Sequence, residues 1–321
     1  YDYDAPISEA GWTTDKFFKT RELFSRYLNP GETIPEPPAK NPVISFAPVT
    51  LSSVAPIFKN LPTPIHDEQP QSMEKYDQGF GCILYRTTIP AGPATTLEAA
   101  AIKDFGFVFL DGERIGVMDR RSGKAKLNLP ARTNTAQLDI LVEPMGRVNF
   151  GPEMKDPKGL IAPLKLGGEV LKGWQLFNLS FNQNMLATLN YSAAPNLTAS
   201  GNTNALSIAA GHAVEGCFPA FWRGMFEIEK PGDTFLDLRT WGKGVVWVNG
   251  HCLARFWNIG PTQTAYIPGC WLKPGKNEII IWDLIGPTSA EIAGLATPIL
   301  DQLRPELDFA RSHRAEVTLK L

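Results

Sequence analysis

Two distant segments of the chain show the same order of hydrophobic and polar positions. Each has an apolar run, a tight turn between two β-rich runs and a final apolar run: 81–89, 107–117 and 136–142 in the first, 221–228, 245–255 and 277–283 in the second. The turns, Asp111-Gly112 and Asn249-Gly250, are 138 residues apart. Such dipeptides favour type I′ hairpins, because both central residues need positive φ. The pattern therefore predicts two copies of one β-module.

One helix is predicted near the N-terminus. Thr13 or Thr14 can cap it, and Asp15 suits its first turn because an acidic side chain is stabilised at the positive end of the helix dipole. Apolar side chains then recur on one face at helical spacing: Phe17, Phe24, Tyr27 and Leu28. Asn29-Pro30-Gly31 ends the helix. The proline-rich residues that follow predict a stiff, extended linker.

The composition predicts a globular protein of two domains. The chain has 321 residues, of which 43% are hydrophobic and 20% charged. Its 27 prolines and 28 glycines indicate many turns and therefore an all-β fold. The net charge of −2 gives no electrostatic footprint for nucleic acid or for an anionic membrane, so neither partner is expected.

The residues that could carry metal or nucleophile chemistry are scattered. None of the four cysteines (Cys82, Cys217, Cys252 and Cys270) and four histidines (His66, His212, His251 and His313) shows zinc-ligand spacing, and no Ser-His-Asp or Cys-His signature is visible. Buried free thiols or one disulfide both fit the cysteines. No metal and no cofactor is expected, and His251 is interpreted as an exposed turn residue.

Aromatic residues crowd the second module: Trp241, Trp247, Phe256, Trp257, Trp271 and Trp282. Exposed aromatic rings could form a carbohydrate platform, but tryptophans in strands more often bury their large area. A role in the core or at a domain interface is therefore favoured. Arg255 and Asn258 are expected to hydrogen-bond loops or a neighbouring domain. Residues 286–310 look like an insertion, and the alternation in 315–321 predicts a half-buried strand.

Four stretches resemble family 35 glycoside hydrolases, the retaining β-galactosidases. Residues 1–11 (YDYDAPISEAG) are similar to the segment that ends the catalytic barrel of the family, and 104–120 to its first β-domain. Residues 141–151, followed by Lys158-Gly-Leu-Ile161, resemble a further family hallmark. The aromatic-rich stretch 244–264 is the most specific of the four.

The resemblance implies a retaining mechanism with two glutamates, whose carboxyl groups lie about 5 Å apart. In the family both glutamates lie on barrel strands upstream of the position of Tyr1. No catalytic residue is therefore expected in this chain, and the chain alone is expected to be inactive. Tyr3 matches a sugar-contacting position of the family and is the one candidate substrate-binding residue.

The resemblance also sets the expected domains. They are residues 1–30 as the end of the barrel, 31–42 as the linker, 43–166 as a first jelly-roll β-sandwich and 167–321 as a second, galactose-binding-like one. The expected partners are the missing barrel and a β-galactoside oligosaccharide or glycoconjugate that carries terminal β-D-galactose. The family suggests an exported protein, periplasmic, extracellular or lysosomal. The alternative is a non-catalytic module that binds carbohydrate or another protein.

Overall fold

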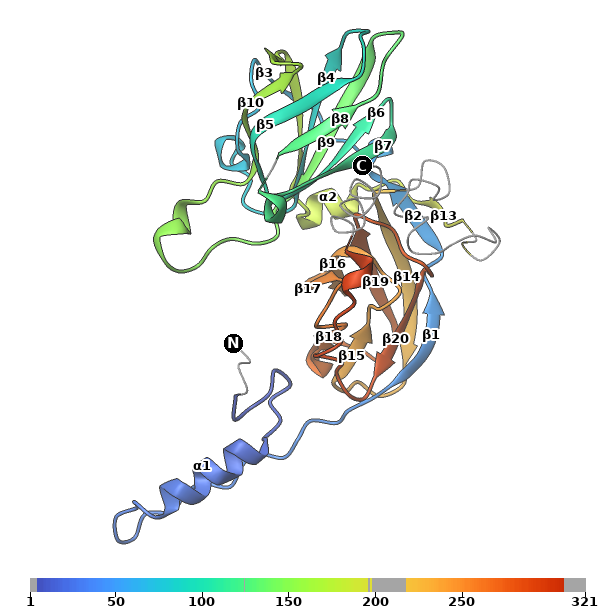
Figure 1. Ribbon diagram of the computed structural model, residues 1–321. Coiled ribbons are helices and arrows are strands. Elements are labelled where there is room, and N and C mark those ends of the chain that lie inside the picture. The colour runs from blue at the N-terminus through green and yellow to red at the C-terminus, as the bar shows by residue number, and fades with distance from the viewer. Residues whose placement is uncertain (1–4, 124, 196, 198–217, 309–321) are drawn as a thin grey trace. The chain divides into compact units, whose positions relative to one another are not determined.

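The computed structural model describes residues 5–123, 125–195, 197 and 218–308. Its strands form four antiparallel sheets, which make two β-sandwiches, and a short helix lies near the N-terminus (Figure 1). This confirms the predicted all-β class. In the described part of the chain, no helix is long and apolar enough to cross a membrane.

Residues 55–192 form the first sandwich. Its larger sheet runs from edge to edge through β3 (Ile65–Asp67), β12 (Trp174–Leu179), β4 (Cys82–Ile89), β9 (Ala136–Glu143), β6 (Phe105–Leu110) and β7 (Glu113–Asp119). Its smaller sheet runs through β11 (Glu169–Val170), β10 (Gly159–Leu166), β5 (Thr95–Lys103) and β8 (Lys126–Leu129).

The second sandwich takes most of its strands from residues 46–54 and 219–305. Its larger sheet runs through β13 (Ser192–Ala193), β2 (Ser53–Pro56), β14 (Ala220–Ile228), β19 (Gly275–Asp283), β16 (Lys243–Val248) and β17 (His251–Trp257). Its smaller sheet runs through β1 (Phe46–Thr50), β20 (Glu291–Leu295), β15 (Thr234–Asp237) and β18 (Thr264–Ile267).

The predicted repeat is confirmed by the strand order. β4-β9-β6-β7 of the first sandwich corresponds to β14-β19-β16-β17 of the second. Both hairpins shift register at the same place, between Val108 and Phe109 in one and between Val246 and Trp247 in the other. These bulges are again 138 residues apart. The two modules therefore share their local irregularities as well as their order of strands.

The hairpin turns form because their residues tolerate positive φ. Asp111 and Gly112 have φ of 50° and 84°, and Asn249 and Gly250 have φ of 48° and 82°. In both copies the first turn residue also accepts a hydrogen bond from the neighbouring strand. Asp111 accepts from the Gln137 backbone N–H at 2.8 Å, and Asn249 from the corresponding N–H, that of Glu278, at 3.0 Å. The side chain thus locks each turn to the next strand.

Two strands lie in a different sandwich from the one expected. β1, which falls in the expected first domain of 43–166, pairs with β20 of the second sandwich. β12, which falls in the expected second domain of 167–321, pairs with β3 and β4 of the first. The physical reason is that strand pairing is non-local, so a strand can leave one module and complete the sheet of another. A strand from before the first sandwich, β1, therefore belongs to the second sandwich, and β12 belongs to the first.

The core of the first sandwich lies between its two sheets. Ile83, Ile140 and Val142 face it from the larger sheet, and Leu160 from the smaller one, all fully buried. Each such side chain contributes roughly 1.5–3 kcal/mol relative to an exposed one. Tyr85 is buried with them because its hydroxyl has partners: it donates to the Gln71 carbonyl at 2.7 Å and accepts from the Leu160 N–H at 3.1 Å.

The predicted N-terminal helix is present as α1 (Asp15–Ser25) with Thr14 as its cap, but it ends before the predicted stop at Asn29, so Tyr27 and Leu28 lie beyond it. The Thr14 hydroxyl accepts from the Phe17 N–H at 3.4 Å. No residue of α1 is buried. Among the described residues, the other short helical segments are α2 (Gln183–Ala187) and the 3₁₀ turns Ile57–Lys59, Met73–Tyr76, Arg120–Ser122, Pro152–Lys155, Gly269–Trp271 and Pro305–Leu307.

The remaining expectations have mixed outcomes. The segment 286–310, interpreted as an insertion, contributes β20, and its one helical turn is Pro305–Leu307. Cys82 is a buried free thiol as expected, but Cys252 and Cys270 are exposed free thiols, so burial was wrong for those two. The predicted strand at 315–321 lies outside the described residues.

Candidate functional site

The candidate sugar-contacting residue Tyr3 lies outside the described residues, and its role stays a prediction. The structure does describe the segment that follows it. The Thr14 hydroxyl donates to the Pro6 carbonyl at 2.9 Å, and the Trp12 N–H donates to the Ser8 hydroxyl at 3.2 Å. Residues 6–14 therefore form a closed loop that leads directly into α1.

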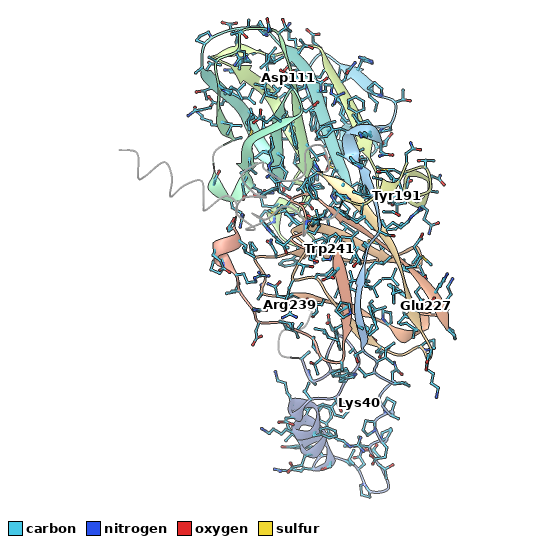
Figure 2. All side chains as sticks on the ribbon, turned by 90° about the vertical axis from the view of Figure 1, so that its right-hand side faces the viewer. Lys40, Asp111, Tyr191, Glu227, Arg239 and Trp241 are labelled. Atoms are coloured by element: carbon cyan, nitrogen blue, oxygen red, sulfur yellow. The ribbon has the colours of Figure 1, made fainter. Side chains whose placement is uncertain are left out.

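The aromatic residues of the second module lie mainly in its core. Trp241 (labelled in Figure 2), Trp247 and Trp282 are buried, and Phe256 is nearly so. The Trp241 indole N–H donates to the Glu291 carbonyl at 2.8 Å, so its polar edge is satisfied. The interpretation as core residues is confirmed for these side chains, which rules them out as an open sugar platform.

The two remaining tryptophans are half-buried and each has a neighbour on its ring. The Lys243 ammonium lies 4.7 Å from the centroid of the Trp257 ring. The Trp271 ring stacks on His251 with centroids 4.5 Å apart and planes tilted by 14°. His251 is exposed beside its turn, as predicted. The Asn258 side chain does not make the expected loop contact, because its Oδ1 is buried without a hydrogen-bond partner among the described residues. Only its backbone carbonyl accepts a bond, from Gln263 Nε2 at 3.0 Å.

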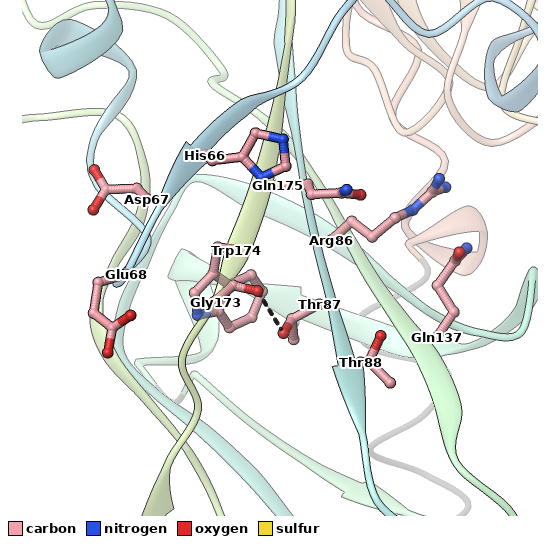
Figure 3. A pocket seen from close by; sticks show the side chains of 10 residues that line it. All are labelled: His66, Asp67, Glu68, Arg86, Thr87, Thr88, Gln137, Gly173, Trp174 and Gln175. Atoms are coloured by element: carbon pink, nitrogen blue, oxygen red, sulfur yellow. Dashed lines mark hydrogen bonds between the residues drawn. The ribbon is translucent and has the colours of Figure 1, made fainter.

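A pocket that sequence reasoning missed lies in the first sandwich. Its volume is about 540 Å³, and its walls come from the same end of four neighbouring strands of the larger sheet, β3, β12, β4 and β9 (Figure 3). Polar side chains dominate the lining, and they include His66, Arg86, Thr88, Gln137 and Gln175. Three of them form a row across the sheet, because Gln175 pairs with His66 on one side and with Arg86 on the other.

One buried carboxylate orients two of the lining side chains. Asp139, with 0% of its surface exposed, pairs across the strands with Arg86. It accepts from Arg86 Nε at 2.7 Å, from Arg86 Nη2 at 3.0 Å and from Gln137 Nε2 at 2.8 Å. The guanidinium also lies 5.3 Å from the centroid of the Phe177 ring. Arg86 and Gln137 therefore reach the pocket in fixed orientations.

The acidic rim of the pocket is held by its neighbours. Burial and the adjacent Asp67 carboxylate raise the pKa of Tyr76, so its hydroxyl stays protonated and donates to Asp67 Oδ2 at 3.1 Å. Glu68 pairs with Lys172 at 3.1 Å. The Thr87 hydroxyl donates to the Gly173 carbonyl at 3.1 Å, the bond drawn in Figure 3. The rim is thus an ordered set of hydrogen-bonding groups.

A second cluster, the charge network, joins five side chains at one end of the same sandwich: Lys103, Asp104, Arg120, Asp156 and Lys158. Lys158 and both aspartates are buried. Asp104 accepts from Lys158 at 2.7 Å and from Arg120 at 2.8 Å. Burial by itself raises the pKa of Asp156, but hydrogen bonds from Lys103, Arg120 and Lys158 outweigh it and hold the pKa well below its usual range.

The charge network anchors both ends of a loop, residues 144–157. Near the first end, the Met145 N–H donates to Asp104 at 3.0 Å, and at the second end Asp156 belongs to the network. Arg147 holds the loop further by donating to the Gly79 carbonyl at 3.0 Å. Between these anchors Phe150 is 87% exposed. The loop projects from the sandwich in Figure 1, so the network presents a large apolar side chain to solvent.

Metal chemistry has no candidate site in the part of the chain that the structure describes. Among the described residues, no group of three or more His, Cys, Asp and Glu side chains could hold a metal ion. The Arg and Lys partners of the charge network likewise fill its carboxylate oxygens. The pocket lining can hydrogen-bond a neutral polar ligand. The charge network can hold the loop 144–157 with Phe150 exposed to solvent.

Comparison with known proteins identifies two domains. Residues 70–180 match the family described as the first all-beta domain of beta-galactosidase, and residues 219–277 match the one described as its galactose-binding domain. A β-galactosidase of Xanthomonas manihotis is 36% identical over 83% of this chain and 41% of its own length. The human β-galactosidase-1-like protein 2 is 35% identical over 89% of this chain and 44% of its own length.

A lectin of Pleurotus ostreatus in its apo form aligns with 78% of this chain and 79% of its own chain at 13% identity, but its TM-score of 0.24 supports no argument. The chain spans less than half the length of the two curated relatives above, and neither matched family is a catalytic domain. Both matches fall on the sandwiches that the structure shows. The chain therefore carries the first all-β domain and the galactose-binding domain of β-galactosidases of the glycoside hydrolase family 35 type, and it is homologous to such proteins over most of its length.

Proposed function

We propose that this chain is the non-catalytic C-terminal part of a retaining β-galactosidase, which hydrolyses terminal non-reducing β-D-galactose residues. One observation carries the proposal: each relative aligns with most of this chain, but the aligned part is less than half of the relative's own length. Retention needs two carboxyl groups about 5 Å apart across the scissile bond. We assign both to glutamates of a barrel upstream of Tyr1, and neither to an acidic residue of the sandwiches.

The role proposed for the sandwiches is to support that barrel. The anchored loop 144–157 supports this role, because buried ion pairs hold the ends of the loop while Phe150 between them is 87% exposed. A large apolar side chain in solvent is suited to a protein contact, since its burial on binding is favourable. Phe150 would then be buried against the barrel in the complete enzyme.

Two finer assignments follow from the family. Tyr3 would lie at the rim of the barrel and direct its hydroxyl towards galactose. The substrates would be β-galactoside oligosaccharides or glycoconjugates, and the enzyme would act outside the cytoplasm, in a periplasmic, extracellular or lysosomal setting. The alternative, a module that binds carbohydrate without hydrolysing it, is favoured by one observation, the polar pocket of the first sandwich.

The test is turnover of an aryl β-galactoside by the chain alone and by the native full-length protein. The proposal expects turnover only in the second case, and loss of that turnover when either barrel glutamate is replaced by glutamine. Hydrolysis by the chain alone that disappears when one acidic residue of a sandwich is replaced would overturn it. Tyr3→Phe in the full-length protein tests the finer assignment: it should raise KM or lower kcat without changing the thermal midpoint.

A further inference from the structure

We infer that the pocket of the first sandwich is a separate carbohydrate-binding site, which takes a neutral hexose residue through Arg86, Gln137 and Gln175. This site goes beyond the proposed function, because binding there involves no hydrolysis. It lies in the all-β domain and not in the domain matched as galactose-binding. Its volume of about 540 Å³ falls within the roughly 300–1,000 Å³ typical of small-molecule sites.

The internal repeat shows that the buried acid of this site is not required by the fold. Asp139 pairs with Arg86 on one side and with Phe109 on the other. At the corresponding place in the second sandwich, Ile280 pairs with Arg223 and with Trp247. The same scaffold therefore forms with an apolar residue in place of the aspartate.

Placing an ion pair with a buried carboxylate in a sheet is energetically unfavourable compared with placing apolar residues there. Removing two charges from water costs several kcal/mol, and replacing such a pair by apolar residues is often neutral or stabilising. What Asp139 supplies instead is geometry, because it fixes both Arg86 and Gln137. Departures from a local packing rule of this kind are expected at functional sites.

The hydrogen-bonding atoms of the pocket that have no partner in the described part of the chain are suited to a sugar. In the described part of the chain, Arg86 Nη1 and Gln137 Oε1 have no hydrogen-bond partner, and neither has the Gln175 side-chain amide. The pocket thus offers a fixed donor beside a fixed acceptor, and a second amide that can do both. Each hydroxyl of a sugar both donates and accepts, so neighbouring hydroxyls match this set.

The charges of the pocket favour a neutral ligand over an anion. Asp139 neutralises Arg86 at 2.7 Å. Asp67 and Glu68 add negative charge at the rim, where Lys172 pairs with Glu68. A carboxylate or phosphate would therefore meet a lining without excess positive charge. A neutral polyol carries no charge, so the carboxylates at the rim do not repel it.

The experiment titrates the full 321-residue chain with lactose, with the Thr88 methyl group as the NMR reporter of the pocket. The account expects a saturable shift of that methyl signal, and weaker binding of galacturonate than of lactose. Gln137→Ala/Gln175→Ala should weaken lactose binding at the pocket at least tenfold. Glu278→Ala, the matched change in the second sandwich, should leave the Thr88 titration unchanged.

Three results would overturn the inference: no saturable shift of Thr88, equal affinity of the double variant, or tighter binding of galacturonate than of lactose. Should Gln137→Ala disturb the fold through Asp139, Gln175→Ala alone decides, because the Gln175 side chain makes no hydrogen bond within the described residues. The readout involves no hydrolysis, so failure here leaves the proposed β-galactosidase role intact.

Discussion

At the scale of single residues, polar side chains in this chain act mainly by fixing backbone. Asn249 holds its hairpin turn, where its side chain donates to the Trp271 carbonyl and to Asn277, both at 2.8 Å, and accepts from Glu278. Asp111 does a simpler version of the same task in the first copy. The stability of each turn therefore depends on an identifiable side chain.

We expect Asn249→Ala to lower the free energy of unfolding by about 4–5 kcal/mol, from backbone strain and the loss of three side-chain hydrogen bonds. Alanine in a left-handed conformation costs about 1–2 kcal/mol, and each lost hydrogen bond adds about 1 kcal/mol. Urea denaturation measures the change, with Asp111→Asn as the matched control that should stay within about 0.5 kcal/mol. An equally small effect of Asn249→Ala would show that the turn lock is not stabilising.

The charge network predicts a dependence of stability on pH. The pKa of Asp156 is lowered in the folded protein, so the stability it contributes is present above its unfolded value of about 3.8 and is lost as the pH falls towards the folded value. Asp156→Asn should therefore flatten the loss of thermal midpoint in this acidic range.

At neutral pH the same variant should lose roughly 3 kcal/mol or more, because Lys158 keeps only Asp104 as its partner. Thermal unfolding from pH 7 to pH 2 measures both effects, because the pH must fall well below 3.8 for the loss to develop. Parallel pH profiles of the two proteins would contradict this account of the network.

At the scale of elements, local signals were predictable and long-range pairings were not. The turns at Asp111 and Asn249 and the cap at Thr14 depend on residues next to one another in the sequence, and all three are present. The exchange of β1 and β12 depends on partners far along the chain, and it was missed.

The pocket shows the same limit. A charged residue in the middle of an apolar strand, such as Arg86 or Asp139, was a visible signal. The pairing of those two residues, and their meeting with His66 from β3 and Gln175 from β12, follows from sheet order alone. The order of strands in a sheet cannot be predicted from the spacing of residues in the sequence.

Two of the elements that carry exposed apolar side chains are α1 and the loop 144–157. Phe24 and Phe150 are 60% and 87% exposed. We expect Phe150→Ser to leave the free energy of unfolding of this chain within about 0.5 kcal/mol, because nothing is unburied. The buried Phe107→Ala should cost about 3–5 kcal/mol and serves as the positive control.

In the full-length protein, Phe150→Ser should loosen the contact with the barrel and lower its thermal midpoint. An unchanged midpoint of the full-length protein would argue against a bracing role for the loop. Urea denaturation of the chain and thermal unfolding of the full-length protein, run side by side, separate the two effects.

At the scale of the whole molecule, the two sandwiches repeat one module but differ in their core and surface residues. The second places most of its tryptophans in the core, and the first holds a buried aspartate beneath a polar pocket. The relatives extend well beyond what this chain spans. We therefore propose that the chain is part of a larger enzyme, in which these domains support a catalytic barrel.

The most direct test of that account is the intact mass of the native protein that carries this sequence, measured under native and then under denaturing conditions. The account predicts about twice the 35.3 kDa of this chain, since the chain spans 41–44% of these two relatives. A native assembly of that size that falls to 35.3 kDa on denaturation would point to a processed enzyme whose barrel is held non-covalently. A mass of 35.3 kDa both before and after denaturation would contradict the enzyme account and favour a separate binding module.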